Sequence, residues 1–277
     1  MHILATDPRR PARPHWQGRR RHVSKGRMAW YGESGNERYW LAYWKARLTP
    51  EYYTEAESAQ LQFDELGRLL LSYMSPDGLH LEAGCGAGYW VAALARAGRH
   101  IEGIEYAREL VRLVREANSS LPVRCEDALA IDRPDGVYDT YLSIGVVEHR
   151  VEGPEPFLAE AFRVLKPGGR ILIAVPYYGP LRRFKQHLFL YESERPHLPF
   201  FQYGFSKRDF VRLLRKEGFY VEFVQPLYAH RLLQEELLGY HWLSTRLHFV
   251  RRMAEHLLYK RDGHMLLVAG QKPENNL

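Results

Sequence analysis

The stretch HLEAGCGAGYW, residues 80–90, places three glycines at every second position, directly after an apolar run that ends in Glu82. Glycines this close together are typical of a turn with positive φ, or of a backbone against which a ligand lies. Two large cofactor-binding families use such a turn after the first strand of a parallel sheet, so the spacing of the glycines has to separate them.

Around this turn the chain alternates short β-rich runs with helical patterns. We expect strands at 79–83, 100–105, 121–125, 137–144 and 170–175, and helices at 88–98, 107–117 and 154–165. Further on we expect an aromatic-rich insert at 177–205, a helix at 206–217, a strand at 219–224, a helical insert at about 227–260 and a strand at 264–270. This β-α-β-α order predicts a doubly wound α/β domain, in which helices cover both faces of a parallel sheet.

The glycine spacing excludes a dinucleotide site. Such a site needs GxGxxG, but the third position is Tyr89 when counted from Gly84 and Val91 when counted from Gly86. The pattern present is E-x-G-x-G-x-G, and it resembles the first motif of class I S-adenosylmethionine-dependent methyltransferases. S-adenosyl-L-methionine is therefore the expected cofactor.

Two acids follow the glycines at the intervals that the resemblance requires. Glu105, in IEGIEYA, stands where an acidic group accepts both ribose hydroxyls, and Asp127, in RCEDAL, where one accepts the adenine amino group. Either acid taken singly could be an ordinary solvated residue at a strand end. The resemblance implies that the cofactor is bound by Glu82, Gly84, Cys85, Gly86, Gly88, Glu105, Tyr106, Asp127, Ala128, Ser143 and Ile144.

Three later segments place the chain in one branch of this superfamily. They are similar to the broad small-molecule branch, which includes ubiquinone-biosynthesis enzymes. The segments are VYDTYLSIGVVEHR (137–150), EAFRVLKPGGRILIAVP (160–176) and YGFSKRDFVRLLRKEGF (203–219). The resemblance covers most of 78–224 and implies a mostly parallel, seven-stranded, Rossmann-like methyltransferase sheet. Residues 1–77 and 227–260 carry no motif of the family, and such segments usually determine the choice of substrate.

His149 is the expected catalytic residue. Methyl transfer is an in-line displacement at a carbon activated by a sulfonium, so the protein mainly has to align the reactants. A base is needed only when the attacking oxygen or nitrogen must lose a proton, and an imidazole beside Glu148 suits this role. The alternative is that this Glu-His pair only holds the loop that frames the pocket.

Aromatic residues are expected to cover the pocket. The segment before the first motif supplies Trp30, Tyr31, Tyr39, Trp40 and Trp44, which are expected to form a helical cover over the cofactor. The alternative is that Trp40 and Trp44, four residues apart, only anchor one helix on the core. The substrate is expected to meet Tyr31 and, directly after the fifth strand, Tyr177, Tyr178, Arg182, Arg183 and His187. The arginines would suit an acidic substrate, although a solvated basic loop explains them equally well.

The second insert has apolar residues at helical spacing, interleaved with basic ones. The apolar positions are Leu243, Leu247, Val250, Ala254 and Leu257, and the basic ones are Arg246, Arg251, Arg252, Lys260 and Arg261. Such a helix could cap the active site, pair with another subunit, or lie on an anionic membrane. Packing against its own domain is the usual outcome for such a stripe.

Charge and composition limit the remaining possibilities. The net charge is +6, and eight Lys or Arg residues lie before Trp30 against Asp7 alone. We expect a basic, flexible arm at 1–29, a helical cover at 30–77 and the methyltransferase domain at 78–277. The arm keeps an RNA methyltransferase open as an alternative to an enzyme of small metabolites, and a non-catalytic cofactor-binding protein is a further one.

The expected location is the cytoplasm. No apolar run approaches the roughly 18 residues that span a bilayer, and the N-terminus lacks a hydrophobic signal segment. With only Cys85 and Cys125 and no CxxC pair, neither a disulfide framework nor a metal site is expected. The oligomeric state does not follow from the sequence.

Overall fold

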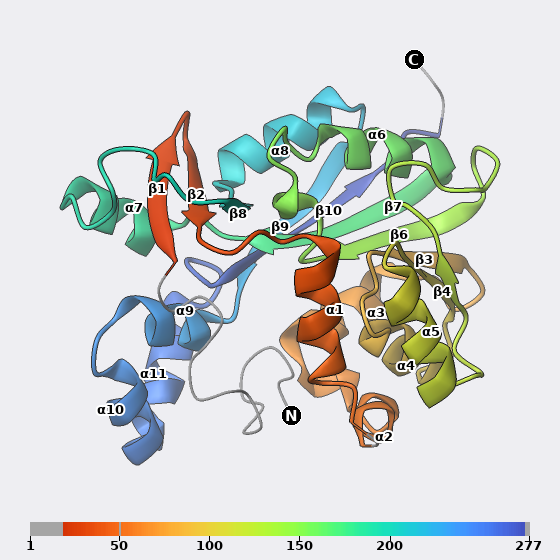
Figure 1. Cartoon of the computed structure of the whole chain (residues 1–277), viewed down its shortest axis with the longest axis horizontal. Coiled ribbons are helices and arrows are strands. Elements are labelled where there is room, and N and C mark those ends of the chain that lie inside the picture. Colours follow the sequence, from red (N-terminus) through yellow and green to blue (C-terminus); the bar gives the residue numbers. More distant parts are fainter. Residues whose placement is uncertain (1–18, 50, 275–277) are drawn as a thin grey trace.

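A twisted seven-stranded sheet forms the centre of the protein in the computed structural model, which describes residues 19–49 and 51–274 (Figure 1). The strand order is β5-β4-β3-β6-β7-β10-β9. In chain order the strands are β3 (Leu79–Ala83), β4 (His100–Glu105), β5 (Val123–Cys125), β6 (Tyr138–Ile144), β7 (Leu165–Pro176), β9 (Tyr220–Leu227) and β10 (Met265–Gln271). Neighbouring strands are parallel except at β10, which runs antiparallel to both β7 and β9.

The expected fold is confirmed. Strands 79–83 and 100–105 have the predicted bounds, and the others differ by a few residues at their ends. The main difference is at β7, which begins at Leu165 rather than after the glycine pair. Its pairing with β6 shifts register between Tyr138 and Thr140, and Gly168 has a φ of +76°. The glycine turn therefore lies inside the strand as an irregularity.

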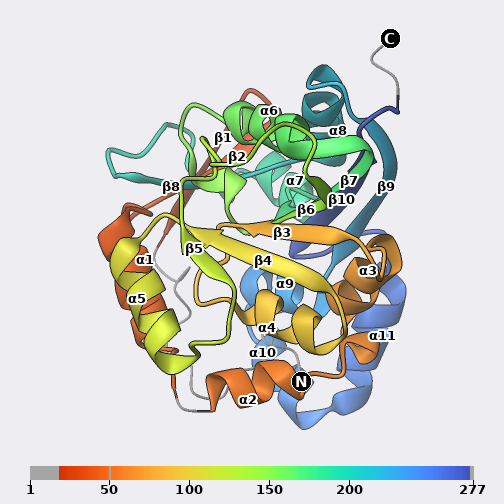
Figure 2. The same cartoon turned by 90° about the vertical axis from the view of Figure 1, so that its right-hand side faces the viewer.

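Helices cover both faces of the sheet (Figure 2). On one face lie α6 (Glu155–Val164) and α8 (Lys207–Lys216), and on the other α3 (Glu65–Tyr73), α4 (Tyr89–Arg96) and α5 (Arg108–Ala117). Each face has its own apolar core. Leu70, Val91 and Leu110 are fully or almost fully buried in one core, and Leu158 and Phe210 in the other.

The segment before the sheet begins with a hairpin. β1 (Arg20–Ser24) and β2 (Arg27–Tyr31) pair with each other and with β8 (Phe200–Gly204) in a small antiparallel sheet. Met28 and Trp30 are buried there, so burial and cross-strand pairing order this part of the chain. The expectation of a flexible arm at 1–29 is thus wrong for residues 20–29, while 1–18 lie outside the described residues.

Short helices connect the hairpin to the sheet. They are α1 (Glu37–Lys45), α2 (Tyr52–Glu57), the 3₁₀ turn η1 (Leu61–Phe63) and α3. α1 begins at Asn36, whose side chain accepts a hydrogen bond from the Tyr39 N–H at 3.0 Å. No residue of α1 is fully buried, and its aromatic side chains lie against one another and against Phe201.

Two inserts complete the structure. The first, after β7, contains α7 (Pro180–His187) and β8, and the second, between β9 and β10, contains α9 (Ala229–Glu236), α10 (Tyr240–Arg246) and α11 (His248–Leu258). A second 3₁₀ turn, η2 (Val147–His149), follows β6. Over residues 19–49 and 51–274, no helix is long and apolar enough to cross a membrane, and no cluster of side chains is suited to hold a metal ion.

Candidate functional site

The glycine turn between β3 and α4 accepts only glycine. Gly84, Gly86 and Gly88 have φ values of +76°, +55° and +73°. A Cβ on Gly84 would lie 2.6 Å from a methyl group of Val146, and one on Gly86 would lie 2.5 Å from the indole of Trp44. The bare backbone therefore serves two purposes, a left-handed conformation and a close approach by neighbouring groups.

Glu105 holds this turn from the end of β4. Its Oε2 accepts a hydrogen bond from the Gly86 N–H at 3.1 Å, and its Oε1 accepts one from the Ala107 N–H at 3.0 Å. The residue is only 5% exposed, and this burial raises the pKa of its carboxyl, although the backbone donors oppose the shift. Glu105, which is predicted to bind the ribose, therefore also links the end of β4 to the glycine turn after β3.

A pocket of about 610 Å³ opens at the carboxyl ends of β3, β4 and β6. Six of the expected cofactor residues line it: Gly84, Glu105, Tyr106, Asp127, Ala128 and Ile144. Asp127 is exposed there, and its Oδ1 accepts a hydrogen bond from the Leu129 N–H at 2.9 Å. The other five, Glu82, Cys85, Gly86, Gly88 and Ser143, are buried behind this lining.

Glu82 provides a test of whether the site fits a cationic cofactor. Its side chain is buried, and its Oε2 has no hydrogen-bond partner within the described part of the chain. Burial raises the pKa of this carboxyl to about 8, and the negative charge of nearby Glu105 adds to the rise. An unpartnered carboxyl oxygen behind a glycine turn suits the ammonium and sulfonium charges of S-adenosylmethionine, so the residues present fit this cofactor.

His149 lies on η2 at the other end of the same pocket. Its Nδ1 is 2.8 Å from the backbone oxygen of Phe201, to which it donates as the N–H of a neutral imidazole. Burial lowers the pKa of His149 to about 4, although backbone hydrogen bonding to Phe201 and Gly145 opposes the shift, so the ring is neutral at pH 7. The Glu148 Oε1 lies 3.9 Å from the His149 Nε2, and burial raises the pKa of Glu148 to about 8.

Aromatic side chains enclose His149. Trp40 of α1 meets the imidazole edge to face with ring centroids 4.8 Å apart, and Phe201 of β8 does the same at 4.9 Å. Trp40 and Trp44 both line the pocket, and both also pack against apolar cores, Trp40 against the core of the small sheet and Trp44 against that of the main sheet. The cover interpretation and the anchor interpretation therefore apply to the same two residues.

The six expected substrate residues do not line this pocket. Tyr31, Tyr177 and Tyr178 are buried, and Arg183 and His187 lie along a separate hollow beside α7. The first insert reaches the pocket through Pro199 and Phe200 instead, and the segment before α1 contributes Ser34, Gly35 and Asn36. These lining residues carry no motif, and only the pairing of β8 with β2 brings them to the site.

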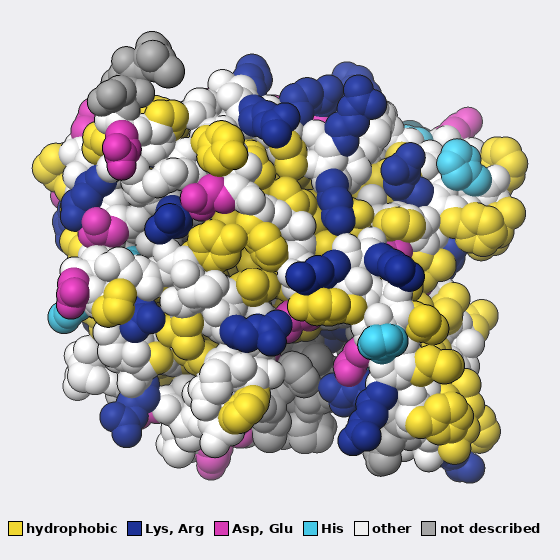
Figure 3. Space-filling view, turned by 180° about the vertical axis from the view of Figure 1, so that it is seen from behind, with side chains coloured by type: hydrophobic (Ala, Val, Ile, Leu, Met, Phe, Trp, Pro, Cys, Tyr) yellow, Lys and Arg dark blue, Asp and Glu magenta, His cyan; other side chains and the backbone are white. Residues whose placement is uncertain are grey.

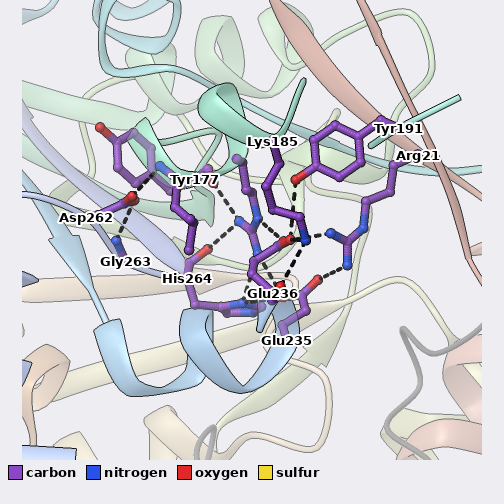
Figure 4. A network of polar contacts seen from close by, with 11 residues as sticks. Arg21, Tyr177, Lys185, Tyr191, Glu235, Glu236, Asp262, Gly263 and His264 are labelled. Carbon is purple, nitrogen blue, oxygen red and sulfur yellow. Dashed lines mark hydrogen bonds and ion pairs between the residues drawn. The ribbon is translucent and has the colours of Figure 1, made fainter. Parts of the chain in front are cut away.

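Arg182 in particular is occupied elsewhere, in the ion cluster around Glu235 and Glu236 that Figure 4 shows. Its guanidinium is fully buried, with Nη2 2.7 Å from Glu235 Oε2 and Nε 2.9 Å from Glu236 Oε1. Burial alone would raise the pKa of both glutamates, but Arg182 together with the other groups paired to them, among them Arg21, holds both pKa values below their usual range. Arg21 and Lys185 also pair with Glu236, so the expectation that Arg182 meets substrate is wrong.

The doubly wound sheet, its glycine turn and the acids at the next strand ends define a protein that binds a nucleoside-type cofactor. Residues 81–173 match the family described as "Methyltransferase domain". A probable S-adenosylmethionine-dependent methyltransferase of Mycolicibacterium smegmatis is 30% identical over 142 residues, which are 51% of this chain and 52% of that protein. A ubiquinone biosynthesis O-methyltransferase of Maricaulis maris is 30% identical over 99 residues, or 34% of this chain and 39% of that protein.

Among solved structures, a possible histamine N-methyltransferase of Thermotoga maritima has the same fold, with a TM-score of 0.51 and 21% identity over 85% of this chain and 97% of that one. The matches to the two curated relatives span about half of their length or less. Residues 81–173 thus match a methyltransferase domain, and the chain is similar to S-adenosylmethionine-dependent methyltransferases, as its glycine turn indicated.

Proposed function

We propose that this protein transfers the methyl group of S-adenosylmethionine to an oxygen or nitrogen atom of a small metabolite. The observation that carries the proposal is the single pocket that joins the cofactor residues to His149 under an aromatic cover. A volume of about 610 Å³ suits a cofactor with one small acceptor. The curated relative that methylates oxygen and the fold neighbour named for a nitrogen acceptor support this acceptor chemistry.

In this proposal S-adenosylmethionine supplies an activated methyl group, and the protein supplies alignment and a dry site. Glu105 and Asp127 hold the nucleoside end, while Glu82, buried behind the lining with one unpartnered oxygen, complements the positive charge of the cofactor. Trp40 and Trp44 cover the pocket and reduce its contact with water.

His149 accepts the proton that the acceptor loses. The bond from Nδ1 to Phe201 leaves Nε2 as the basic atom, and the proton that arrives there produces an imidazolium. That positive charge lowers the pKa of the neighbouring Glu148 carboxyl. In this proposal the Glu148–His149 pair acts as one acid-base unit, and the alternative remains that it only holds the loop that frames the pocket.

The test is a turnover assay that detects S-adenosylhomocysteine with a panel of phenols, carboxylates, amines and RNA. Turnover with a small acceptor, lost in the His149→Gln variant, supports the proposal. Methyl transfer to RNA alone would replace it with the RNA methyltransferase alternative. Tight binding of the cofactor without turnover on any acceptor would favour the non-catalytic alternative.

A further inference from the structure

The two inserts expose large apolar side chains on one edge of the molecule. In the second insert these include Leu238, Trp242, Phe249, Met253 and Leu257, all at least half exposed. At the end of α7, Phe189 is 90% exposed. In Figure 1 α7, α10 and α11 lie on the same side, and Figure 3, seen from behind, shows hydrophobic side chains gathered along that edge. We call this surface the apolar edge.

The apolar stripe in the second insert therefore does not pack against its own domain. Of its members only Ala254 is buried, while Leu243, Leu247 and Leu257 are exposed. A contiguous exposed patch of this kind marks a surface that binds another partner. Exposure of these apolar side chains to water costs free energy, so a partner that covers them would be favoured.

Positive charge accompanies the apolar side chains. Residues 237–261 contain five Lys or Arg residues and one acid, Glu255, which pairs with Arg251. The guanidinium of Arg246 lies over the ring of Trp242, 4.7 Å from its centroid. Lys260 is similarly placed over Tyr259 at 5.3 Å. Cations beside aromatic rings are typical of groups that sit at the boundary between lipid headgroups and acyl chains.

A cationic hollow adjoins α7. Its volume is about 540 Å³, and the side chains of Lys25, Arg183, Lys207 and Arg208 line it together with His187. No carboxylate is among the described residues that line it. Cations from a hairpin turn and two helices thus face one space, and an anionic group such as a phosphate would relieve their mutual repulsion.

The buried ion cluster holds the two inserts in fixed relation. Arg182 and Lys185 of α7 pair with Glu235 and Glu236 at the end of α9, and Arg21 of β1 joins them (Figure 4). All five side chains are mostly buried, so removing one would leave an uncompensated charge. The apolar tips of α7 and of the second insert are therefore presented together.

From these observations we infer that the apolar edge docks on the surface of an anionic lipid bilayer. Apolar side chains enter the boundary region, while the surrounding cations and the hollow beside α7 face lipid phosphates. Charge decides against a second copy of this chain, because a symmetric contact would bring two positively charged edges together. This inference is independent of the acceptor in the proposed function.

Binding to vesicles tests the inference directly. Full-length protein is sedimented with vesicles of phosphatidylcholine alone and with vesicles that also contain phosphatidylglycerol. We expect binding to the anionic vesicles that weakens as salt increases, and at least about tenfold weaker binding to the neutral ones. A Leu238→Glu, Phe249→Glu double variant should lose binding to both.

Matched variants separate the contributions. Tyr220→Glu places a charge on another exposed apolar residue, at the start of β9, and should bind as the unaltered protein does. Arg246→Glu with Arg252→Glu should remove the preference for anionic vesicles, because it reverses two exposed cations. Thermal melting verifies that each variant is folded.

Three results would overturn the inference. One is the absence of binding to anionic vesicles by folded, full-length protein at low salt. Another is a dimer, seen by light scattering, that the Leu238→Glu, Phe249→Glu variant abolishes, since the apolar edge would then be a contact between copies of the chain. Equal binding by the double variant and the unaltered protein would likewise exclude this surface.

Discussion

Replacing Glu105 by Gln should weaken cofactor binding and destabilise the glycine turn together. The substitution keeps the shape of the side chain but removes its charge and turns one acceptor into a donor. Because the carboxylate now accepts from both Gly86 and Ala107, one of these buried N–H groups would face an amide NH₂. A buried donor without a partner costs about 1–3 kcal/mol of stability.

The effect on affinity follows from the lost charge. A hydrogen bond to a charged group contributes about 1.5–3 kcal/mol, and a ribose hydroxyl would lose such a bond, so S-adenosylmethionine should bind roughly 10- to 100-fold more weakly. Titration calorimetry measures the affinity, and denaturant unfolding measures the stability. Glu109→Gln is the matched control, because that carboxylate is exposed on α5 and pairs with the exposed Arg112.

One result would refute this reasoning. If the Glu105→Gln variant unfolds more easily but binds S-adenosylmethionine as tightly as before, Glu105 only ties the strand ends and does not contact the cofactor. Unchanged stability and unchanged affinity would refute both parts.

Three other variants test separate features of the structure. Because burial raises the pKa of Glu82 to about 8, binding of the cationic cofactor at pH 7 should release a proton from this carboxyl. The affinity for the cofactor should therefore rise from about pH 6 to about pH 8 and then level off. Calorimetry in buffers of different ionisation enthalpy detects the released proton, and Glu82→Gln should remove the pH dependence. His149→Gln should lower turnover about 10²- to 10⁴-fold with cofactor affinity near normal, and a loss of stability alone would favour the framing role. Arg182→Met should lower the free energy of unfolding, measured with denaturant, by about 3–5 kcal/mol, because it removes the main partner of Glu235 and Glu236. Arg183→Met, at an exposed position, is the control. A smaller loss of stability for Arg182→Met than for this control would contradict the role of the ion cluster.

The sequence alone determined the sheet and the cofactor end of the site. Both depend on short-range patterns: alternating β-rich and helical runs, three glycines in five residues, and acids at the ends of successive strands. Parallel strands place their carboxyl ends along one edge of the sheet, so Gly84, Glu105 and Asp127 meet at the pocket although they are far apart in the chain. His149 also reaches the pocket because it follows β6 directly.

Only the tertiary structure shows which residues of the inserts line the pocket. Arg182 follows the end of β7 by only a few residues, yet its partners are 53 and 54 positions further on, and no local pattern shows that they will meet. Pro199 and Phe200 reach the pocket because β8 pairs with a hairpin more than 160 residues before it. The exposure of the second insert likewise depends on whether another part of the domain packs over it. The helical spacing of its apolar residues shows only that one face is apolar, not whether that face is covered.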